Sequence, residues 1–479
     1  MSGYIEGTDR GQTTLFPEQL EDWIGEDNPV RVIDLFVDEI DLAEIGFGRT
    51  APASTGRPGY RPSVLLKLFI HGYLNRVPSS RALEREAGRN VEVMWLTGRL
   101  APDHKTIADF RRDNGPAIRK TCAQFVELCR IIGVLKGDCV AIDGSKFKAV
   151  NNRDKNFTKG KIASRIAHLE AGIARYLEEM VRTDRQEEGE ARAEKIANLT
   201  RRTGRIRQEI QRLQDMDRAL KESPDSQISL TDPDARSMAT SARGSGFVGY
   251  NAQAAVDTET HLIVTHDVIN DGHDREQLSP MAKGAKAALG RDEMSAVADK
   301  GYFSGREILS CHEDGITPTL PRPETSGNRK KGMYVKADFA YDADVDVYRC
   351  PAGETLTYRY TTEEAGLVVR RYWTSHCQAC PLKTRCTTSK ERRITRWEHE
   401  HLVDDMHDRI SRDPGVMALR RSTVEHPFGT IKAWMGATHF RMRELKNVRT
   451  EMAFHVLAYN IKRVINMIGV RPLLRAIAA

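Results

Sequence analysis

One short stretch, residues 139–149 (CVAIDGSKFKA), constrains the fold of this chain most strongly. Its first four residues, 139–142, are apolar and partly β-branched, which predicts a buried strand. Asp143 follows directly, and a carboxylate without a partner is costly in a protein core. We therefore expect the strand to end at Asp143, where the core opens onto a site. The competing interpretation of this stretch alone is an acid in an ordinary turn.

The composition of the 479 residues is that of a globular protein, and the length suggests two to four domains. The net charge of +6 is a mild basic bias that is compatible with nucleic-acid binding. No apolar run approaches the roughly 20 residues that cross a bilayer, and the first residues lack the pattern of a secretory signal. These features predict a cytoplasmic protein with reduced thiols and no membrane contact.

Residues 1–133 are expected to form a helical N-terminal domain of short helices joined by tight turns. Ser80 is a candidate N-cap, and Thr106 and Asp109 have the spacing of a capping box. Such a region, with arginines on its outer faces, suits a helix-turn-helix-like DNA-binding module, and a plain helical bundle is the alternative. The arginines are Arg76, Arg81, Arg85, Arg111 and Arg112.

Residues 160–223 carry two heptad-like apolar seams separated by a polar break. Apolar side chains recur at alternating steps of four and three over 162–180, and similar spacing resumes over 196–220. We expect two helices that fold back as an antiparallel coiled-coil hairpin inserted after the first strand, or a dimer contact. The mixed charges favour a solvated structural arm over a DNA contact.

The pattern changes to short strands after the arm, which makes the expected fold class α/β. A β-hairpin is followed by a helix, a strand that again ends on an acid, a second helix and a last strand. The mixed sheet would belong to a catalytic domain at 134–470. The strands are expected at 247–257, 261–269, 293–299 and 316–320, and the second acid is Asp299.

A third acid, Glu425, lies in a predicted helix near the C-terminus. Arg421 lies one turn before it and Lys432 two turns after it, on the same helical face, while Pro427 must kink or interrupt that helix. Phosphodiester chemistry with two metals needs clustered carboxylates that hold ions about 4 Å apart. The candidate carboxylates are Asp143, Asp299 and Glu425.

Five other acids have simpler explanations. Asp257 lies at a hairpin turn, where aspartate is common for backbone reasons. Asp232 and Asp234 lie in a polar loop, and Asp271 and Asp274 could cap the helix that follows. We rank each of them as a weaker candidate for a metal ligand.

Residues 322–400 are expected to form a cysteine-rich metal-binding insertion. Clustered thiols in a cytosolic chain favour a metal over a disulfide. Structural zinc held by four thiolates is the first choice, because it would fold a module with a thin core. An iron–sulfur cluster is the second choice, and four free thiols are the remaining alternative. The cysteines are Cys350, Cys377, Cys380 and Cys386, and His376 could replace one of them.

Basic side chains crowd the end of the cysteine region and the C-terminal helices. They are either a solvated face or, beside a nuclease-like site, a track for DNA phosphates. They comprise Lys383, Arg385, Lys390, Arg392, Arg393 and Arg396 with Trp397 among them, and then Arg441, Arg443, Lys446 and Arg449.

These motifs together resemble the bacterial insertion-sequence DDE transposases, which share an RNase H-like fold. The acids Asp143, Asp299 and Glu425 resemble the DDE triad, and the Arg-x3-Glu-x6-Lys spacing resembles the signature around its glutamate. Ala418 stands where that signature has a tyrosine. The cysteine segment and the stretches PDHKTIADFR, DPDARSM, GYNAQAAVD and ADKGYF also resemble one transposase group, in collinear order over nearly the whole chain.

The resemblance implies a bacterial, cytoplasmic DNA transposase that acts at the nucleoid. It would bind double-stranded DNA at the terminal inverted repeats of the element and at the target site. Asp143 would bridge two Mg2+ ions, or Mn2+, with Asp299 and Glu425 as flanking ligands. Water would cut the element end, and the freed 3'-OH would attack target DNA, with at least a homodimer to pair the ends. A catalytically silent DNA-binding relative and an RNase H-like nuclease are the alternatives. Arg421, Lys432, Lys146 and Lys300 would bind phosphate.

Overall fold

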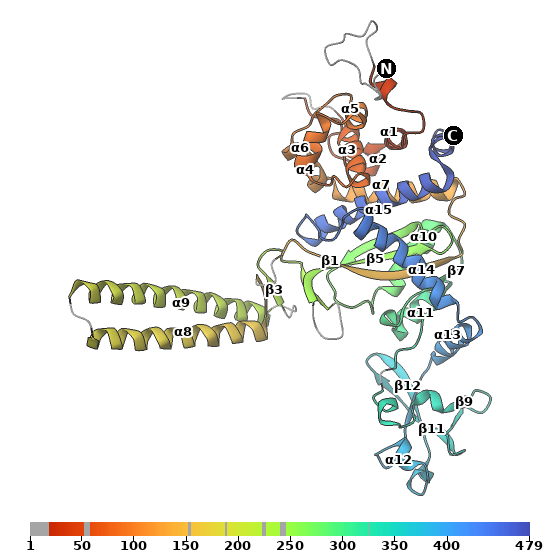
Figure 1. Cartoon of the computed structure of the whole chain (residues 1–479). Helices are drawn as coiled ribbons and strands as arrows, with labels where there is room; N and C mark the ends of the chain where they lie inside the picture. Colours follow the sequence, from red (N-terminus) through yellow and green to blue (C-terminus); the bar gives the residue numbers. More distant parts are fainter. Residues whose placement is uncertain are drawn as a thin grey trace, which may run out of the picture.

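The structure is a computed structural model of a mixed α/β protein, which confirms the expected class (Figure 1). Helices from both ends of the chain cover a central sheet. A helical arm projects to one side of this sheet, and a smaller sheet lies below it in the view of Figure 1. Residues 1–18 and 52–57 of the expected N-terminal helical domain lie outside the described residues. The structure describes residues 19–51, 58–151, 155–186, 189–222, 227–239, 246–324 and 326–479.

The N-terminal region is helical, as expected. Its helices are η1 (Leu20–Trp23), α1 (Val30–Asp38), α2 (Leu42–Ile45), α3 (Pro62–Leu74), α4 (Ser80–Ala87), α5 (Val91–Thr97), α6 (His104–Asp113) and α7 (Gly115–Ile131). Two predicted caps are wrong. Asp103, not Thr106, caps α6, because its carboxylate accepts hydrogen bonds from the free N–H groups of Lys105 and Thr106. The N-cap position of α4 is Ser79 rather than Ser80, and its side chain makes no capping bond.

Arg111 is buried, which makes its expected place on the outer surface wrong. It lies on the same face of α6 as Ile107, so the helix carries it into the core. Its guanidinium donates a hydrogen bond to the Tyr73 hydroxyl at 2.9 Å and lies against the Phe69 ring. The charge is thereby accommodated inside the helical region and is withdrawn from any DNA-facing surface.

The central sheet has six strands: β1 (Cys139–Lys148), β4 (Arg236–Ala239), β5 (Gly246–Asp257), β6 (Ile263–Ile269), β7 (Met294–Val297) and β8 (Ile316–Thr319). The order is β4-β5-β1-β7-β8, and β6 also pairs with β5 as the expected hairpin. β1 is antiparallel to β5 and parallel to β7. The expected end of the first strand at Asp143 is wrong, because β5 pairs with β1 as far as Lys148.

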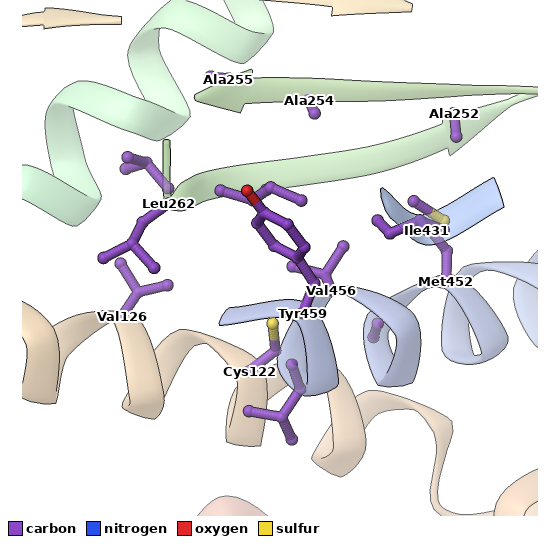
Figure 2. Packing of buried hydrophobic residues seen from close by; sticks show 14 of the residues in the cluster. Cys122, Val126, Ala252, Ala254, Ala255, Leu262, Ile431, Met452, Val456 and Tyr459 are labelled. Carbon is purple, nitrogen blue, oxygen red and sulfur yellow. The ribbon is translucent and has the colours of Figure 1, made fainter. Parts of the chain in front are cut away.

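Helices from distant parts of the chain pack against this sheet. They are α10 (Leu278–Leu289), α11 (Gly305–Glu313), α13 (Glu400–Arg412), α14 (Val416–Gly429) and α15 (Leu445–Ile468), while α16 (Val470–Ile477) packs against α1 and α15. α15 packs against α3, α7 and β6, and Figure 2 shows Met452, Val456 and Tyr459 in the buried layer between β5 and α7. One continuous core therefore joins the N-terminal helices to the sheet. The boundary expected near residue 133 does not separate two cores.

Two acids of the DPDARSM stretch fix the start of α15. Asp232 is fully buried and accepts hydrogen bonds from the Tyr250 hydroxyl at 2.8 Å and the Glu444 N–H at 3.0 Å. Asp234 accepts one from the Leu445 N–H at 2.8 Å. These bonds give both acids a structural role, since they satisfy N–H groups at the helix start.

The arm consists of α8 (Lys159–Gln186) and α9 (Glu190–Glu222), which pack side by side and extend away from the body (Figure 1). Its base is a pair of short strands, β2 (Asn156–Thr158) and β3 (Gln227–Ser229). Seam residues such as Ile162, Leu199 and Leu213 are buried, as the heptad spacing predicts. Within the described ranges, no helix, including α8 and α9, has the length and apolarity needed to cross a membrane.

The cysteine region contains a sheet that the sequence pattern did not predict. Its strands are β9 (Ala340–Asp342), β10 (Val347–Arg349), β11 (Thr355–Glu364), β12 (Leu367–Trp373) and β13 (Ile394–Trp397), in the order β13-β12-β11-β10-β9. A short helix, α12 (Lys383–Cys386), carries one of the cysteines. The region has its own small core of Phe339, Tyr348, Leu356, Tyr372 and Ile394.

Replacing Asp232 by alanine should destabilise the protein by about 2–3 kcal/mol, because the buried Tyr250 hydroxyl and a helix-start N–H lose their acceptor. Asp234→Ala is the matched control and should cost about 1 kcal/mol, because it removes one capping bond. Urea denaturation of both variants measures the difference. Equal losses would contradict the role assigned to Asp232.

Candidate active site

Asp143 lies within β1 and faces α14. Its partner on β5 is Ala254, and Ser145 is paired with Ala252, so small side chains leave room for groups that reach down from α14. The Oδ1 atom of Asp143 accepts one hydrogen bond, from the Gly144 N–H at 2.9 Å. It also forms an ion pair with the Arg420 guanidinium at 2.8 Å.

Asp299 lies beside Asp143 because β1 and β7 are parallel neighbours in register. Ala141 pairs with Val297, and each acid follows its paired residue by two positions. The Asp299 carboxylate accepts the Gly301 N–H at 2.7 Å and so caps the short helix η3 (Lys300–Tyr302). The structure therefore brings together two of the three acids that the sequence singled out.

The electrostatic environment of Asp143 disfavours its charge. Its pKa is raised to about 6. Burial is the main cause, and the negative charges of Asp299 and Asp274 act in the same direction, while Arg420 and the Gly144 N–H act in the opposite direction. Arg420 and the Gly144 N–H therefore do not fully offset the cost of its charge. A bound cation would supply what this site lacks.

Asp274 is a further acid at this site, and its expected role as a helix cap is wrong. α10 begins after Gln277, without a side-chain cap, whereas Asp274 accepts hydrogen bonds from the amides of Asn251 and Gln253, both at 2.7 Å. The sequence holds a signal for it: Asn251 and Gln253 are buried amides in an otherwise apolar strand, and buried amides need partners.

Gly144 allows this close approach. A Cβ atom at Gly144 would lie 2.3 Å from the Gln253 amide nitrogen and 2.7 Å from Oδ1 of Asp274. The glycine of the opening motif is therefore required for packing between β1, β5 and the Asp274 loop. The carbonyl oxygen of the Gln253 amide in turn accepts a hydrogen bond from the Tyr302 hydroxyl, beside Asp299.

Glu425 lies on α14 but is exposed, and within the described residues no hydrogen bond or ion pair joins it to Asp143 or Asp299. Arg421 is also exposed, one turn earlier on the same face. The buried face of α14 includes Thr423 and Val424, and Arg420 shares that face by its spacing. The arginine that reaches Asp143 is therefore Arg420, whereas the sequence had singled out its neighbour Arg421.

Lys432 reaches β1 through a change of helix type. α14 continues through Pro427 to Gly429, and a π-helical turn, η7 (Thr430–Trp434), follows it. The wider turn changes the rotation per residue. The prediction that Lys432 lies on the same helical face as Glu425 assumed a regular helix and therefore does not hold. Its Nζ donates to the Ser145 hydroxyl at 2.6 Å and the Lys146 carbonyl at 3.0 Å. Burial lowers the pKa of Lys432, while Asp143 raises it.

The other two predicted phosphate ligands lie on either side of the acids. The ammonium group of Lys146 donates to the Gly272 carbonyl at 3.1 Å, which ties β1 to the loop before Asp274. Lys300 directly follows Asp299 and is exposed. Lys300 is thus the more accessible of the two lysines.

The four clustered cysteines line one cavity of about 20 Å3, together with His376. All four are free thiols, and burial with the other three cysteines raises the pKa of Cys386, while Arg392 lowers it. Nδ1 of His376 is hydrogen bonded to Glu354 at 2.7 Å. Across the described ranges, however, no group of three or more His, Cys, Asp or Glu side chains is arranged to hold a metal ion. Zinc and an iron–sulfur cluster stay predictions.

The predicted basic track is only partly on the surface. Arg396 is buried, lies over the Tyr341 ring and donates to Asp404 at 2.8 Å, and Trp397 is buried as well. Their expected contact with DNA is therefore wrong, since both belong to the packing of the small sheet. Arg449 donates to Asp267 at 2.9 Å and is likewise engaged within the protein.

Two segments match models of known families. Residues 18–113 match a model described as a transposase domain (DUF772), and residues 349–465 match a transposase DDE domain. The second segment contains Glu425, Lys432 and the four clustered cysteines, whereas Asp143 and Asp299 lie outside both segments. A search of curated proteins finds no match.

A search of solved structures finds the piggyBac transposase in a synaptic complex with hairpin DNA, determined by cryo-EM. The two chains are 9% identical, with a TM-score of 0.35 over 94% of this chain and 79% of that one. This likeness is too weak to support an argument about function.

Replacing Asp143 by asparagine should stabilise the metal-free protein at pH 8 by about 1–3 kcal/mol. The pKa of Asp143 is raised by folding, so its charged form costs stability, and this cost grows as the pH rises from about 4 to above 6. Urea denaturation at pH 5 and pH 8 measures the effect. The advantage of the variant should shrink at pH 5, and an advantage independent of pH would contradict this account.

Proposed function

This chain resembles the DDE transposases, and from that premise we propose that it cuts DNA at the ends of an insertion sequence and joins them to target DNA. The observation that carries the proposal is the placement of Asp143 and Asp299 two residues beyond the paired residues Ala141 and Val297 of neighbouring parallel strands. Arg420 and Lys432 reach the same part of β1. Paired element ends would require at least a homodimer. The mixed sheet supports an RNase H-like catalytic domain interrupted by the helical arm and the cysteine module.

The acids at this site fit a divalent cation by their chemistry. Mg2+ takes oxygen ligands, and Asp143 is a carboxylate whose pKa is raised by burial and by the neighbouring acids Asp299 and Asp274. Asp143 and Asp299 would hold the ions, and Glu425 would complete the set from α14, which already packs on β1 and β7. Two bound Mg2+ ions would supply Lewis-acid activation of the attacking oxygen and stabilise the leaving oxygen.

The chain's own residues would position DNA around these acids. Lys300 and Arg421 are exposed beside the site and can contact phosphates from solvent. Lys432 holds Ser145 and the backbone of β1, which fixes the strand that carries Asp143. The N-terminal helices, which share the sheet's core, would bind the terminal inverted repeat as a rigid extension of the catalytic region.

The cysteine module would hold a structural zinc ion. The four cysteines line the cavity that they share, together with His376 and Glu354, and thiolates in this number are the usual ligands of structural zinc. The module's core has five buried residues, so a metal crosslink would add stability that the core cannot supply. An iron–sulfur cluster in the same place is the alternative.

Cleavage of a labelled element end in Mg2+ tests the site. Asp143→Asn, Asp299→Asn and Glu425→Gln should each reduce cleavage at least a hundredfold, because each removes a charged metal ligand. Asp408→Asn, an exposed acid on α13, is the control and should cleave normally. Retained cleavage in the Asp143 variant would sink the proposal. Cleavage without joining to target DNA would indicate a nuclease, and DNA binding without cleavage a silent relative.

Metal analysis of the purified protein should find one zinc ion per chain in a colourless sample. Cys380→Ser should lose it, while Cys139→Ser, outside the cluster, should keep it. A brown sample with bound iron would indicate an iron–sulfur cluster instead. A protein purified under reducing conditions without any metal would contradict both assignments.

A further inference from the structure

The ion pair between Arg420 and Asp143 has consequences beyond structural support. The guanidinium reaches from α14 to Oδ1 of Asp143 at 2.8 Å, and the two side chains are 14% and 26% exposed. The Nε atom of Arg420 is buried and has no hydrogen-bond partner among the described residues. The guanidinium is therefore aimed at the acid rather than held by a network of its own.

We propose that Arg420 occupies the position of a divalent cation beside Asp143 in the metal-free protein, and that metal binding transfers Arg420 to a DNA phosphate. This inference rests on the proposed function. It assigns the arginine that acts at Asp143 to Arg420 rather than to Arg421. Arg420 would pair first with Asp143 and then with a DNA phosphate.

The contacts of Asp143 favour such an exchange. Its Oδ1 atom accepts the Gly144 N–H and lies 2.8 Å from the Arg420 guanidinium. A metal ion held by this carboxylate would compete with the guanidinium for the same charge. Arg420 is the partner that can leave, because its side chain is flexible, whereas the Gly144 N–H is fixed in the strand.

The negative charges around Asp143 explain why a positive partner is favoured beside it in the metal-free protein as well. Asp274 and Asp299 stand near Asp143, and their electrostatic effect on it is unfavourable. Lys432 cannot take this role while its Nζ is bonded to Ser145 and the Lys146 carbonyl. Arg420 neutralises the acids until metal arrives.

The chemistry of the released side chain fits a phosphate. A guanidinium presents a planar fork of donors that matches phosphate oxygens, and DNA would bring a phosphate to the same edge of the sheet. Exchange of a carboxylate for a phosphate keeps Arg420 paired in both states. Metal binding would thus release Arg420 from Asp143, and the released side chain would then contact a DNA phosphate.

Binding of Mn2+ without DNA, measured by calorimetry, tests the first half of this proposal. Arg420→Gln should bind Mn2+ about tenfold more tightly than the wild type, because the competing positive charge in the ion pair with Asp143 is lost. Arg412→Gln, at an exposed arginine of α13 outside the site, is the control and should bind Mn2+ as the wild type does. Arg420→Lys, which keeps the charge and the packing more closely, should fall between wild type and Arg420→Gln.

Cleavage at saturating metal tests the second half and should move in the opposite direction. Arg420→Gln should cut DNA at least tenfold more slowly, because the phosphate loses its partner. Unchanged or weaker Mn2+ binding in both Arg420 variants would overturn the inference while leaving the proposed function in place. If Asp143→Asn binds Mn2+ as well as the wild type, the metal site itself is absent and both proposals fail.

Discussion

A charged carboxylate in the middle of a buried strand is the constraint on which the rest of this structure depends. Asp143 follows three fully buried residues of β1, and its charge is opposed by burial and by two neighbouring acids. A fold selected for stability alone would place a neutral side chain there. The surrounding elements instead supply positive charge and hydrogen-bond donors to this one position.

Each of these elements reaches the site through a specific feature of the sequence. Alanines on β5 leave room above Asp143, and Gly144 lets the Gln253 amide approach. The parallel pairing with β7 brings Asp299 alongside, and α14 delivers Arg420. The π-helical turn then points Lys432 at Ser145, so a local irregularity places a cation where a regular helix would not.

The sequence predicted five of the six central strands and the helical arm, because their apolar spacing is set by local geometry, but it did not predict the small sheet of the cysteine region. It also located Asp143 and Asp299, since an acid at the end of an apolar run is unusual. It failed where tertiary packing decides the outcome. The inward arginines Arg111 and Arg420 could not be told from their exposed neighbours, since charged side chains are mostly exposed. The partners of Asp274 depend on strand pairing over more than 20 residues.

The central claim is that Asp143 and Asp299 form one metal site from which Arg420 withdraws. A crystal structure of the protein soaked in Mn2+, with anomalous scattering recorded, tests this claim most directly. We expect an anomalous peak about 2 Å from carboxylate oxygens of both acids, with the Arg420 guanidinium no longer paired with Asp143. A fully soaked crystal without a peak at these acids, and with the Arg420–Asp143 pair intact, would contradict it.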